Sequence, residues 1–547
     1  MANRKLFKSP ASVTRAPAAD TTNRAGGSAY KMSDKHALAQ IACTNCFNGT
    51  FYASAEENLK IAKQAALALT SDPEFIAKVA VYSRTQGYMK DMPAFLCTVL
   101  AGIDPPLFRR VFRRVINNGK MLRNFIQMAR SGAVGGRSFN MSAGTCRHAI
   151  QEWFNSKSPW ALFKAQVGND PSMRDILRMA RPKPNTAEKS ALYGYFLGKD
   201  VDVAELPEVA RLYEEYKRTK KGDVPNVDFR LLDSLGLGPK EWTQVAINAP
   251  WMMTRMNLNT FARHDVFKGK QGEKTAEIVA ARLRNAEEIA KAMQFPYQMY
   301  TAWQATNESN DIPFCIKDAL QDAMEISINN VPVIPGTVYV CVDTSGSMGS
   351  SITGSSPGRK ASTTQCVQVA GLIASAIVRK NRSAQVYTFN TSATHVSLNP
   401  RDTVITNTQK LARAGGGTSI SVPLRDLNAQ KAKGDAVIYV SDYESWFDSY
   451  GFSGYNPLYG SSTGLASEWE LFKKRNPKAR LICIDLTPRS NSQIKEREDV
   501  LQVGGFSDAV FNVVSSFVEH GSARDHWVDV IERVAIDEEV AAVEEVE

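Results

Sequence analysis

Residues 337–350 read TVYVCVDTSGSMGS, with an aspartate and two serines at alternate positions behind a short apolar run. A short apolar run rich in β-branched residues is typical of a buried strand. Asp343, Ser345 and Ser347 then follow the carboxyl end of that strand, the edge where α/β proteins place their ligand sites. Carboxylate and hydroxyl oxygens at this spacing favour a hard divalent cation, Mg²⁺ or Mn²⁺.

The chain beyond this motif repeats the same kind of pattern. Short apolar runs (AQVYTFN, AVIYVSD and RLICIDL) alternate with helical patterns such as TQCVQVAGLIASAIVRK and SEWELFKKR. This alternation predicts an α/β doubly wound domain with a parallel sheet. Thr418, in the glycine loop AGGGTS, and Asp442, at the end of AVIYVSD, fall on the same edge as Asp343. The five residues predict a metal site, and the alternative is a metal-free turn in which Asp343 caps a helix.

The chain before this domain has a different periodicity. Apolar residues recur at three- and four-residue spacing in segments such as ENLKIAKQAALALT and PPLFRRVFRRVINNGKMLRNFIQMAR, which predicts amphipathic helices. Helix after helix without strand patterns suggests helical pairs stacked as a solenoid. The predicted units are a flexible arm over 1–32, or one laid across a neighbouring surface, a helical-repeat domain over 33–332, the α/β domain over 333–530 and an acidic tail over 531–547.

The charge is unevenly distributed along the chain. Residues 1–330 carry 45 Lys and Arg against 32 Asp and Glu, whereas the remainder is slightly acidic. Such a surplus fits a polyanionic partner or a merely solubilising surface. The sequence has no long apolar segment, no secretory leader and eight scattered cysteines, which favours the cytoplasm and reduced thiols.

Arginines recur at helical spacing in the basic region. Arg174, Arg178 and Arg181 form one polar stripe with Lys183 beyond it, and Arg123 and Arg130 form another that leads to Arg137. The segment LFRRVFRRV adds four more arginines over 109–114. We expect these stripes to line one concave surface and to pair with phosphates, the alternative being solvated helix faces.

Several longer segments together resemble one family. They are LRMARPKP, WMMTRMNLNTFARH, IPFCIKDALQDAMEISINNVPVIPG, VYVCVDTSGSM, SDYESW, FKKRNPKARLICIDL and GGFSDAVFNVV. Over about residues 30–530 the chain resembles the Ro autoantigen family, TROVE-domain RNA-binding proteins with a von Willebrand factor A domain, in a bacterial or phage-like version. The resemblance implies an α-helical HEAT-like repeat ring closed by an A domain that carries a metal-ion-dependent adhesion site.

The resemblance also implies a function and its partners. A basic ring cavity would take single-stranded 3′ ends of structured or misfolded RNA, and the outer surface would bind a small noncoding Y-like RNA. An exoribonuclease is a possible partner in RNA quality control or decay. We expect a monomeric, non-enzymatic protein that does not bind membranes. The residues expected to contact RNA are Arg123, Arg130, Arg137, Arg174, Arg178, Arg181, Lys183, Arg255 and Arg263.

Two other classes of function fit parts of the same pattern. A protein-recruitment scaffold would use the metal to hold a partner's carboxylate. A hydrolase would use the metal to activate water, but one cation surrounded mainly by neutral hydroxyls is poorly suited to that. No nucleophile elbow, phosphate-binding loop or metal-spaced histidine pair occurs.

Overall fold

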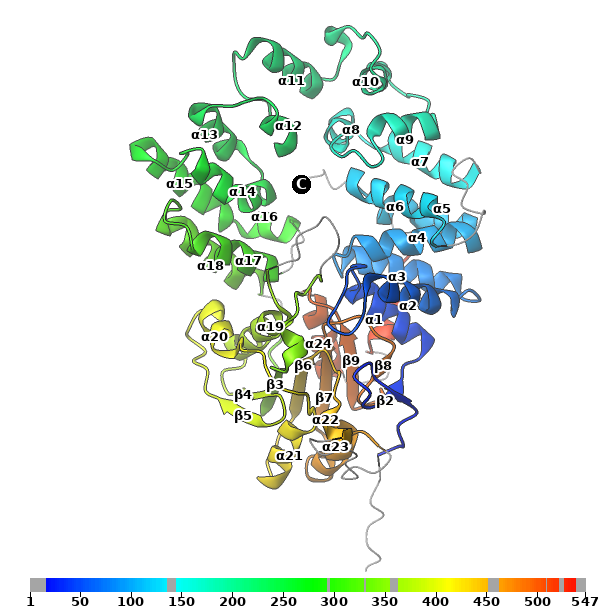
Figure 1. Cartoon of the computed structure of the whole chain (residues 1–547), viewed down its shortest axis with the longest axis vertical. Helices are drawn as coiled ribbons and strands as arrows, with labels where there is room; N and C mark the ends of the chain where they lie inside the picture. The colour runs from blue at the N-terminus through cyan, green and yellow to red at the C-terminus, as the bar shows by residue number, and fades with distance from the viewer. Residues whose placement is uncertain are drawn as a thin grey trace, which may run out of the picture.

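The structure is a computed structural model that describes residues 16–134, 144–292, 296–328, 331–354, 363–450, 462–507, 509–520 and 526–537. Figure 1 shows an arc of helices that rises from one side of an α/β domain, turns over at the top and descends to the other side. The arc and the domain together form a ring. The prediction of a helical ring followed by a doubly wound domain is therefore confirmed.

The arc consists of α1 to α18. Their bounds are α1 Asp34–Thr44, α2 Ala55–Leu67, α3 Pro73–Thr85, α4 Asp91–Ile103, α5 Pro105–Val115, α6 Gly119–Ser131, α7 Gly144–Ser156, α8 Pro159–Ala165, α9 Met173–Ala180, α10 Ala187–Leu197, α11 Glu208–Thr219, α12 Phe229–Asp233, α13 Pro239–Asn248, α14 Trp251–Arg263, α15 Gly269–Leu283, α16 Ala286–Lys291, α17 Pro296–Asn307 and α18 Phe314–Ser327, with a 3₁₀ turn at Val203–Glu205.

Local capping sets where several of these helices begin and end. Ser54 and Glu57 form a reciprocal capping box at the start of α2, and Asn118 caps α6. At the other end of α6, Gly132 adopts φ +69°, which ends the helix in a left-handed turn.

The first half of the arc has two rows of helices. In one row α3 contacts α5, α5 contacts α7 and α7 contacts α9, while in the other α4 contacts α6 and α6 contacts α8. This pairing is the solenoid stacking that the periodicity predicts.

The α/β domain contains one six-stranded sheet with the order β5-β4-β3-β6-β7-β9. All neighbours are parallel except β5 on β4, and Val340 of β3 lies opposite Val386 and Ile438. The strands are β3 Val338–Asp343, β4 Gln385–Phe389, β5 Ala393–Val396, β6 Ala436–Ser441, β7 Arg480–Asp485 and β9 Val500–Gly504.

Helices cover both faces of this sheet because its central strands are apolar on both sides. The helices are α19 Cys366–Lys380, α20 Val404–Leu411, α21 Val422–Ala429, α22 Phe447–Tyr450, α23 Gly464–Arg475, α24 Ala509–His520 and α25 Trp527–Glu532, with a 3₁₀ turn at Gly346–Gly349. Val340 and Ile438 belong to the core shared with α19 and α24, whereas Cys341 and Tyr439 face Trp469 of α23.

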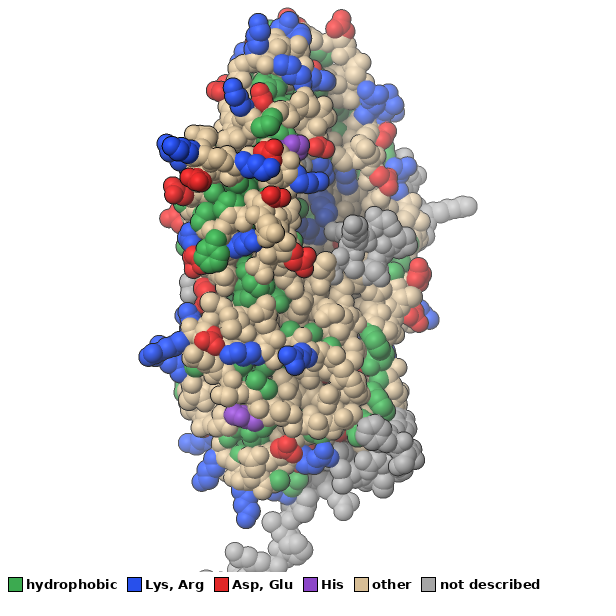
Figure 2. Space-filling model, turned by 60° about the vertical axis from the view of Figure 1, so that its left-hand side comes forward, with side chains coloured by type: hydrophobic (Ala, Val, Ile, Leu, Met, Phe, Trp, Pro, Cys, Tyr) green, Lys and Arg blue, Asp and Glu red, His purple; other side chains and the backbone are tan. Residues whose placement is uncertain are grey.

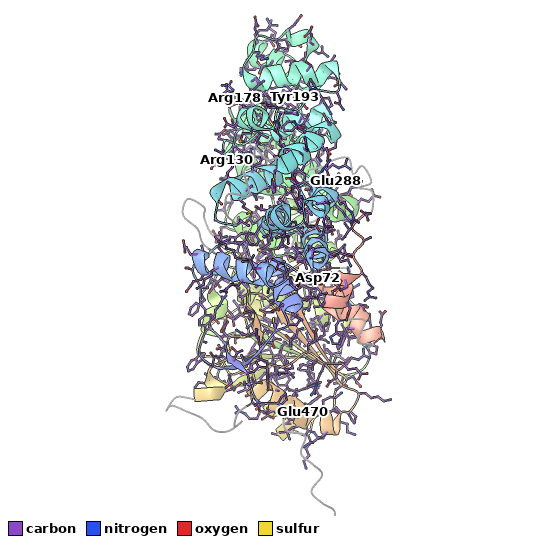
Figure 3. The ribbon with its side chains drawn as sticks, turned by 90° about the vertical axis from the view of Figure 1, so that its right-hand side faces the viewer. Asp72, Arg130, Arg178, Tyr193, Glu288 and Glu470 are labelled. Carbon is purple, nitrogen blue, oxygen red and sulfur yellow. The ribbon has the colours of Figure 1, made fainter. Side chains whose placement is uncertain are left out.

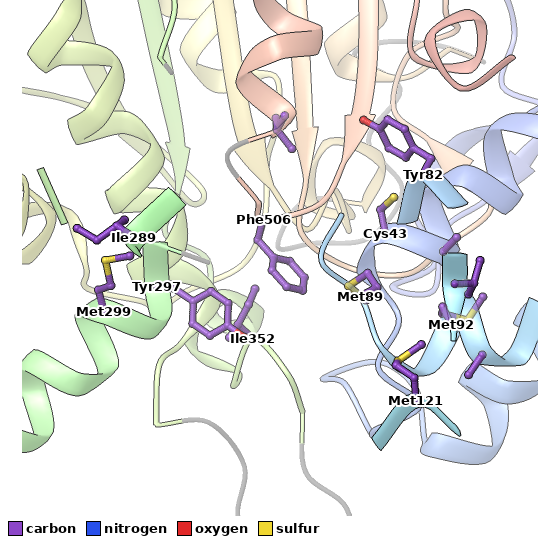
Figure 4. Close-up of a cluster of buried hydrophobic side chains, with 14 of the residues drawn as sticks. Cys43, Tyr82, Met89, Met92, Met121, Ile289, Tyr297, Met299, Ile352 and Phe506 are labelled. Carbon is purple, nitrogen blue, oxygen red and sulfur yellow. The ribbon is translucent and has the colours of Figure 1, made fainter. Parts of the chain in front are cut away.

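The ring closes through apolar contacts between the arc and the sheet domain. At one end α1 contacts β9, and at the other α17 contacts α19. Figure 4 shows Tyr297 of α17 beside Phe506 and Ile352 of the sheet domain. The rings of Tyr297 and Phe506 meet edge to face with centroids 5.7 Å apart, so the seam is a packed aromatic contact.

The structure differs from the predicted units at the two ends of the chain, where the arm is laid across the sheet domain rather than flexible and the last helix extends into the predicted tail. The arm is not flexible over 16–32: β1 Thr21–Thr22 pairs with β2 Ser28–Lys31, and β2 adds antiparallel to β8 Asn491–Ser492. Tyr30 of β2 is fully buried, which a polar composition did not reveal. The acidic tail does not begin at 531 either, because α25 runs through that position and packs on α1 and α3.

In the described part of the chain, the helices are too short or too polar to span a bilayer.

Candidate metal centre and nucleic-acid interface

The aspartate-serine motif forms a compact loop at the end of β3. The Asp343 carboxylate is fully buried and accepts a hydrogen bond of 2.8 Å from the Ser345 backbone N–H. The hydroxyls of Ser345 and Ser347 lie 3.2 Å apart. Ser441, at the end of the neighbouring strand β6, donates to the second Asp343 oxygen at 2.5 Å. Four oxygen-bearing side chains therefore lie together at this edge of the sheet.

The glycine loop before Thr418 is tied to this motif by its backbone. Gly415 N–H donates to the Thr344 carbonyl at 2.8 Å, and Gly346 N–H donates to the Gly416 carbonyl at 2.9 Å. Gly416 has φ +84°, a conformation that favours glycine. These bonds bring Thr418, which is 1 % exposed, into the same cluster of loops.

Asp442 completes the predicted set from the end of β6. Its buried carboxylate is hydrogen-bonded to the Ser347 side chain. Burial raises the pKa of Asp343 to about 7, and the charge of Asp442 adds to the effect. Burial also raises the pKa of Asp442. Two buried carboxylates with raised pKa values are electrostatically suited to a bound cation.

The donor set fits a hard divalent cation. Within the described residues, no group of three or more His, Cys, Asp or Glu side chains could hold a metal ion. A metal here would therefore be held by two carboxylates together with hydroxyls of the serines and Thr418, an all-oxygen set that suits Mg²⁺ or Mn²⁺.

Residues from distant parts of the chain cover this cluster. A cavity of about 20 Å³ over Ser347 and Asp442 is also lined by Arg24, Tyr52 and Glu444. The Tyr52 side chain is hydrogen-bonded to Ser347, and burial raises the Tyr52 pKa to about 12. The Ala25 N–H donates to the Glu444 carboxylate at 3.2 Å. The metal loops thus face the chain's own arm and α1–α2 loop.

Larger cavities lie inside the ring. One of about 470 Å³ and one of about 430 Å³ share Lys90, Lys120 and Met256, so they adjoin each other. Their linings come from α6 and α8 on one side of the arc and from α14 on the other. Figure 2 shows a hollow in the upper half of the molecule with Lys and Arg side chains inside it.

Cations and aromatic rings line these cavities. Lys164 lies 4.9 Å from the ring centroid of Trp160, a tryptophan that is 38 % exposed. The cationic residues around the two cavities are Lys90, Lys120, Lys164, Arg230 and Arg255. The two acids are engaged, because Asp228 pairs with Arg230 and Asp91 accepts a hydrogen bond from Asn124.

The expectation that Arg123 contacts RNA is contradicted by its burial. Its guanidinium, 7 % exposed, donates to the carbonyls of Pro171, Gly119 and Ala165. Burial lowers its pKa to about 10. Arg123 therefore joins α6 to the end of α8 and the start of the α9 segment.

The arginine stripes do not line the two cavities inside the ring. Arg130, Arg178, Arg181 and Lys183 are exposed, and none of them borders the two cavities. Arg130 and Arg178 both lie near Asp175. The hydrogen bonds between Asp175 and Ser172 lower the pKa of Asp175 most, and the charges of Arg178 and Arg130 lower it further. Figure 3 shows these two arginines along one edge of the molecule.

The remaining predicted residues have mixed placements. Arg174 is exposed and donates to the Phe196 carbonyl at 3.4 Å. Arg255 lines the larger cavity, donates to the Gln298 carbonyl at 2.9 Å, and has its pKa lowered to about 10 by burial. Arg263 is exposed and donates to Thr260, and Arg137 lies outside the described residues.

Comparison with known proteins supports the architecture. The family model described as the Ro60 vWA domain matches residues 337–518. The chain is 24 % identical over 535 residues to the RNA-binding protein RO60 of Deinococcus radiodurans, covering 90 % of this chain and 94 % of that protein. The chain is thus similar to Ro proteins over most of its length. The crystal structure of the Deinococcus radiodurans RO (RSR) protein matches with a TM-score of 0.58 at 18 % identity, over 89 % of this chain and 100 % of that one.

Sequence reasoning missed most residues around the cavities of this Ro-type ring. Lys90 and Lys120 lie next to helix starts, and Lys164 and Trp160 lie four positions apart on the short helix α8. None of them belongs to an arginine stripe. The four-residue spacing of Trp160 and Lys164 predicts that the two side chains share one face of α8. It does not predict whether that face borders a cavity or the outer solvent.

Proposed function

We propose that this Ro-like protein binds RNA and that single-stranded 3′ ends enter the cavities of its ring. The observation that carries the proposal is the set of five cationic side chains that converge there from both halves of the arc. Lysine and arginine attract phosphates, and this attraction supplies most of the affinity for nucleic acid. The Deinococcus relative is an RNA-binding protein, which agrees with this proposal.

Aromatic and thioether groups favour unpaired nucleotides over duplex as the cavity ligand. Trp160 and Met256 are exposed, and Lys164 lies over the Trp160 ring. Bases that are not paired can stack on such groups, whereas the bases of a duplex are already stacked on each other.

The exposed cations outside the cavities provide a second contact surface. Arg130, Arg178, Arg181 and Lys183 would hold the backbone of a small structured RNA of the Y-like kind. An RNA held outside with its 3′ end in the ring suits a role in RNA quality control or decay, with an exoribonuclease as the degrading partner.

The metal-dependent recruitment of a protein partner has less support. A partner carboxylate would have to reach the metal past Arg24 and Tyr52, into a cavity of about 20 Å³. A cation bound by Asp343, Asp442 and the hydroxyls would instead stabilise the loops that join the A domain to the helical arc.

A gel-shift titration of two RNAs tests the proposal. A hairpin with a single-stranded 3′ overhang should bind at least about tenfold more tightly than the same hairpin made blunt, at about 0.15 M salt. The Lys120→Gln/Lys164→Gln variant should lose that preference. Its matched control replaces Lys380 and Lys474, two exposed lysines of the A domain, with Gln. Equal affinity for both hairpins, or an equal loss in the control, would contradict the cavity model.

A further inference from the structure

The loop between α1 and α2, residues 45–54, reaches from the helical arc to the metal loops of the sheet domain. Tyr52 of this loop is half-buried and borders the small cavity that Ser347, Asp442 and Glu444 also line. The Tyr52 side chain is hydrogen-bonded to the side chain of Ser347. Since Ser347 is one of the five residues expected to hold the cation, a residue of the arc directly contacts the candidate metal centre.

Three carboxylates lie close to the Tyr52 hydroxyl. Burial, and after it the charges of Asp442, Glu444 and Asp343, raise the pKa of Tyr52 to about 12. The phenol is therefore neutral at physiological pH. It acts on the site as a hydrogen-bond partner and not as a further negative charge.

A neutral phenol at this place can orient the Ser347 hydroxyl. A serine hydroxyl that binds a cation offers a lone pair to the metal and its proton to another acceptor. Tyr52 is that acceptor here, while the Ser345 hydroxyl, 3.2 Å from that of Ser347, competes for the same proton when no cation is bound. A cation withdraws electron density from the Ser347 oxygen and so strengthens the hydrogen bond to Tyr52.

The rest of the α1–α2 loop is held on the segment that follows Ser347. The Asn48 side chain donates to the Thr353 carbonyl at 2.5 Å. Gly354 approaches the Gly49 carbonyl so closely that a side chain at Gly354 would collide with it. Asn48 and Thr353 line both the small cavity over Ser347 and the ring cavity of about 470 Å³. The loop is therefore a contact between the two domains that borders both the candidate metal centre and the ring interior.

We propose that Tyr52 is a positioning residue of the metal centre and that a cation bound there fastens the α1–α2 loop of the arc to the sheet domain. The ring then has a metal-dependent latch beside one of its closing contacts. The coupling is reciprocal, because docking of the loop raises the metal affinity by the same factor by which the metal favours docking. This inference concerns metal binding and ring closure, and its tests contain no RNA, so its outcome is independent of the proposed RNA binding.

Calorimetric titration of the full-length protein with Mn²⁺ tests the role of Tyr52 in metal binding. Tyr52→Phe keeps the ring and removes the hydroxyl, and it should weaken Mn²⁺ binding about fivefold, the loss expected for one hydrogen bond. Tyr195→Phe is the matched control, since it removes a hydroxyl that donates to Glu214 at 2.6 Å, on α10 at the far end of the arc (Figure 1). Its Mn²⁺ affinity should equal that of the parent. Equal affinity in Tyr52→Phe and the parent, or no uptake by the parent, overturns the inference.

Hydrogen exchange with and without Mg²⁺ tests the latch itself. In the parent, saturating Mg²⁺ should slow exchange over residues 45–58 about threefold or more, because the docked loop opens less often. In Tyr52→Phe at saturating Mg²⁺, and in Asp343→Asn, this slowing should disappear. A purely structural role of Tyr52 would speed exchange equally with and without Mg²⁺ and would leave the effect of the cation intact. That result, or an effect of Mg²⁺ that survives in Asp343→Asn, contradicts the proposal.

Discussion

Two arginines of α6 show how differently the fold can use one residue type. Arg123 and Arg130 lie two helical turns apart in a segment where both were expected to meet RNA. Arg123 points into the contact between helices and satisfies three backbone carbonyls, while Arg130 is exposed beside Arg178. A buried guanidinium with several acceptors stabilises the fold, and an exposed one is available to a ligand.

We expect Arg123→Ala to lower the free energy of unfolding by about 2–4 kcal/mol, because three buried carbonyls lose their donor. Arg130→Ala should change stability by less than about 0.5 kcal/mol and should weaken RNA binding instead. Urea titrations and gel shifts on both variants check this. A stable Arg123→Ala protein with impaired RNA binding would restore the original expectation.

At the scale of elements, three loops at one sheet edge form the candidate metal centre. The loop after β3 starts from Asp343, the last residue of that strand, the glycine loop brings Thr418, and Asp442 directly follows β6. Backbone hydrogen bonds between the first two loops preorganise the oxygens before any metal binds. The buried carboxylates of Asp343 and Asp442 repel each other, so without a bound cation their ionisation destabilises the folded state.

The effect of Mg²⁺ on stability should therefore depend on pH. The Asp343 pKa is raised to about 7, so the folded state binds a proton that the unfolded state releases near pH 3.8. The apo fold thus loses stability as pH rises through this window, and bound Mg²⁺ restores it. Thermal melts should show a larger Mg²⁺-induced rise in Tm at about pH 8 than at about pH 5.5. A rise that shrinks toward high pH would contradict the site.

Asp343→Asn should abolish Mg²⁺ and Mn²⁺ binding, because it removes one of the two carboxylates of the site. Calorimetry measures the metal uptake directly. The affinity for single-stranded RNA should stay within a few-fold of the parent, since the cavity cations Lys120 and Lys164 lie on the helical arc. Unchanged metal uptake would show that the cation binds elsewhere.

At the scale of the whole molecule, the ring depends on two contacts between the arc and the sheet domain. The seam at α17 uses Tyr297, Phe506 and Ile352, all buried or nearly so. The α1–α2 loop closely approaches the loop of Ile352, because a side chain at Gly354 would collide with the Gly49 carbonyl. Ile352 also lines the small cavity over Ser347 and Asp442. The candidate metal centre therefore lies next to the ring seam.

Phe506→Ala should loosen this seam and lower stability by about 3–5 kcal/mol, as for other buried aromatic residues. Hydrogen exchange should become faster in α17 and in the loop around Ile352, while the central strands β3 and β6 stay protected. Exchange that increases evenly over the whole chain would mean that the ring does not open locally at this contact.

The spacing of apolar residues along the sequence is local information, and it was enough to predict the helical arc and the parallel sheet. Alternating apolar runs and helical patterns predict the sheet, and the carboxyl ends of parallel strands share one edge, so Asp343, Thr418 and Asp442 could be assigned to one site in advance. The tertiary structure had to decide where each polar helix face points. A helical period predicts that Arg123, Arg130 and Arg178 lie on the polar faces of their helices. It does not predict whether each of these faces meets a neighbouring helix, the ring cavity or the outer solvent.

The same limit applies to contacts between distant segments. Tyr52 and Arg24 cover the metal loops from about three hundred residues away, and Asp537 reaches Arg110 across most of the chain. No spacing in the sequence records such pairs, because they arise only when the arc closes on the sheet domain. Helix packing buries Arg123, which then has a structural role, and it leaves Lys120 and Lys164 at the wall of the cavity. Both outcomes depend on the packed arc, because the cavity exists only once the helices have assembled.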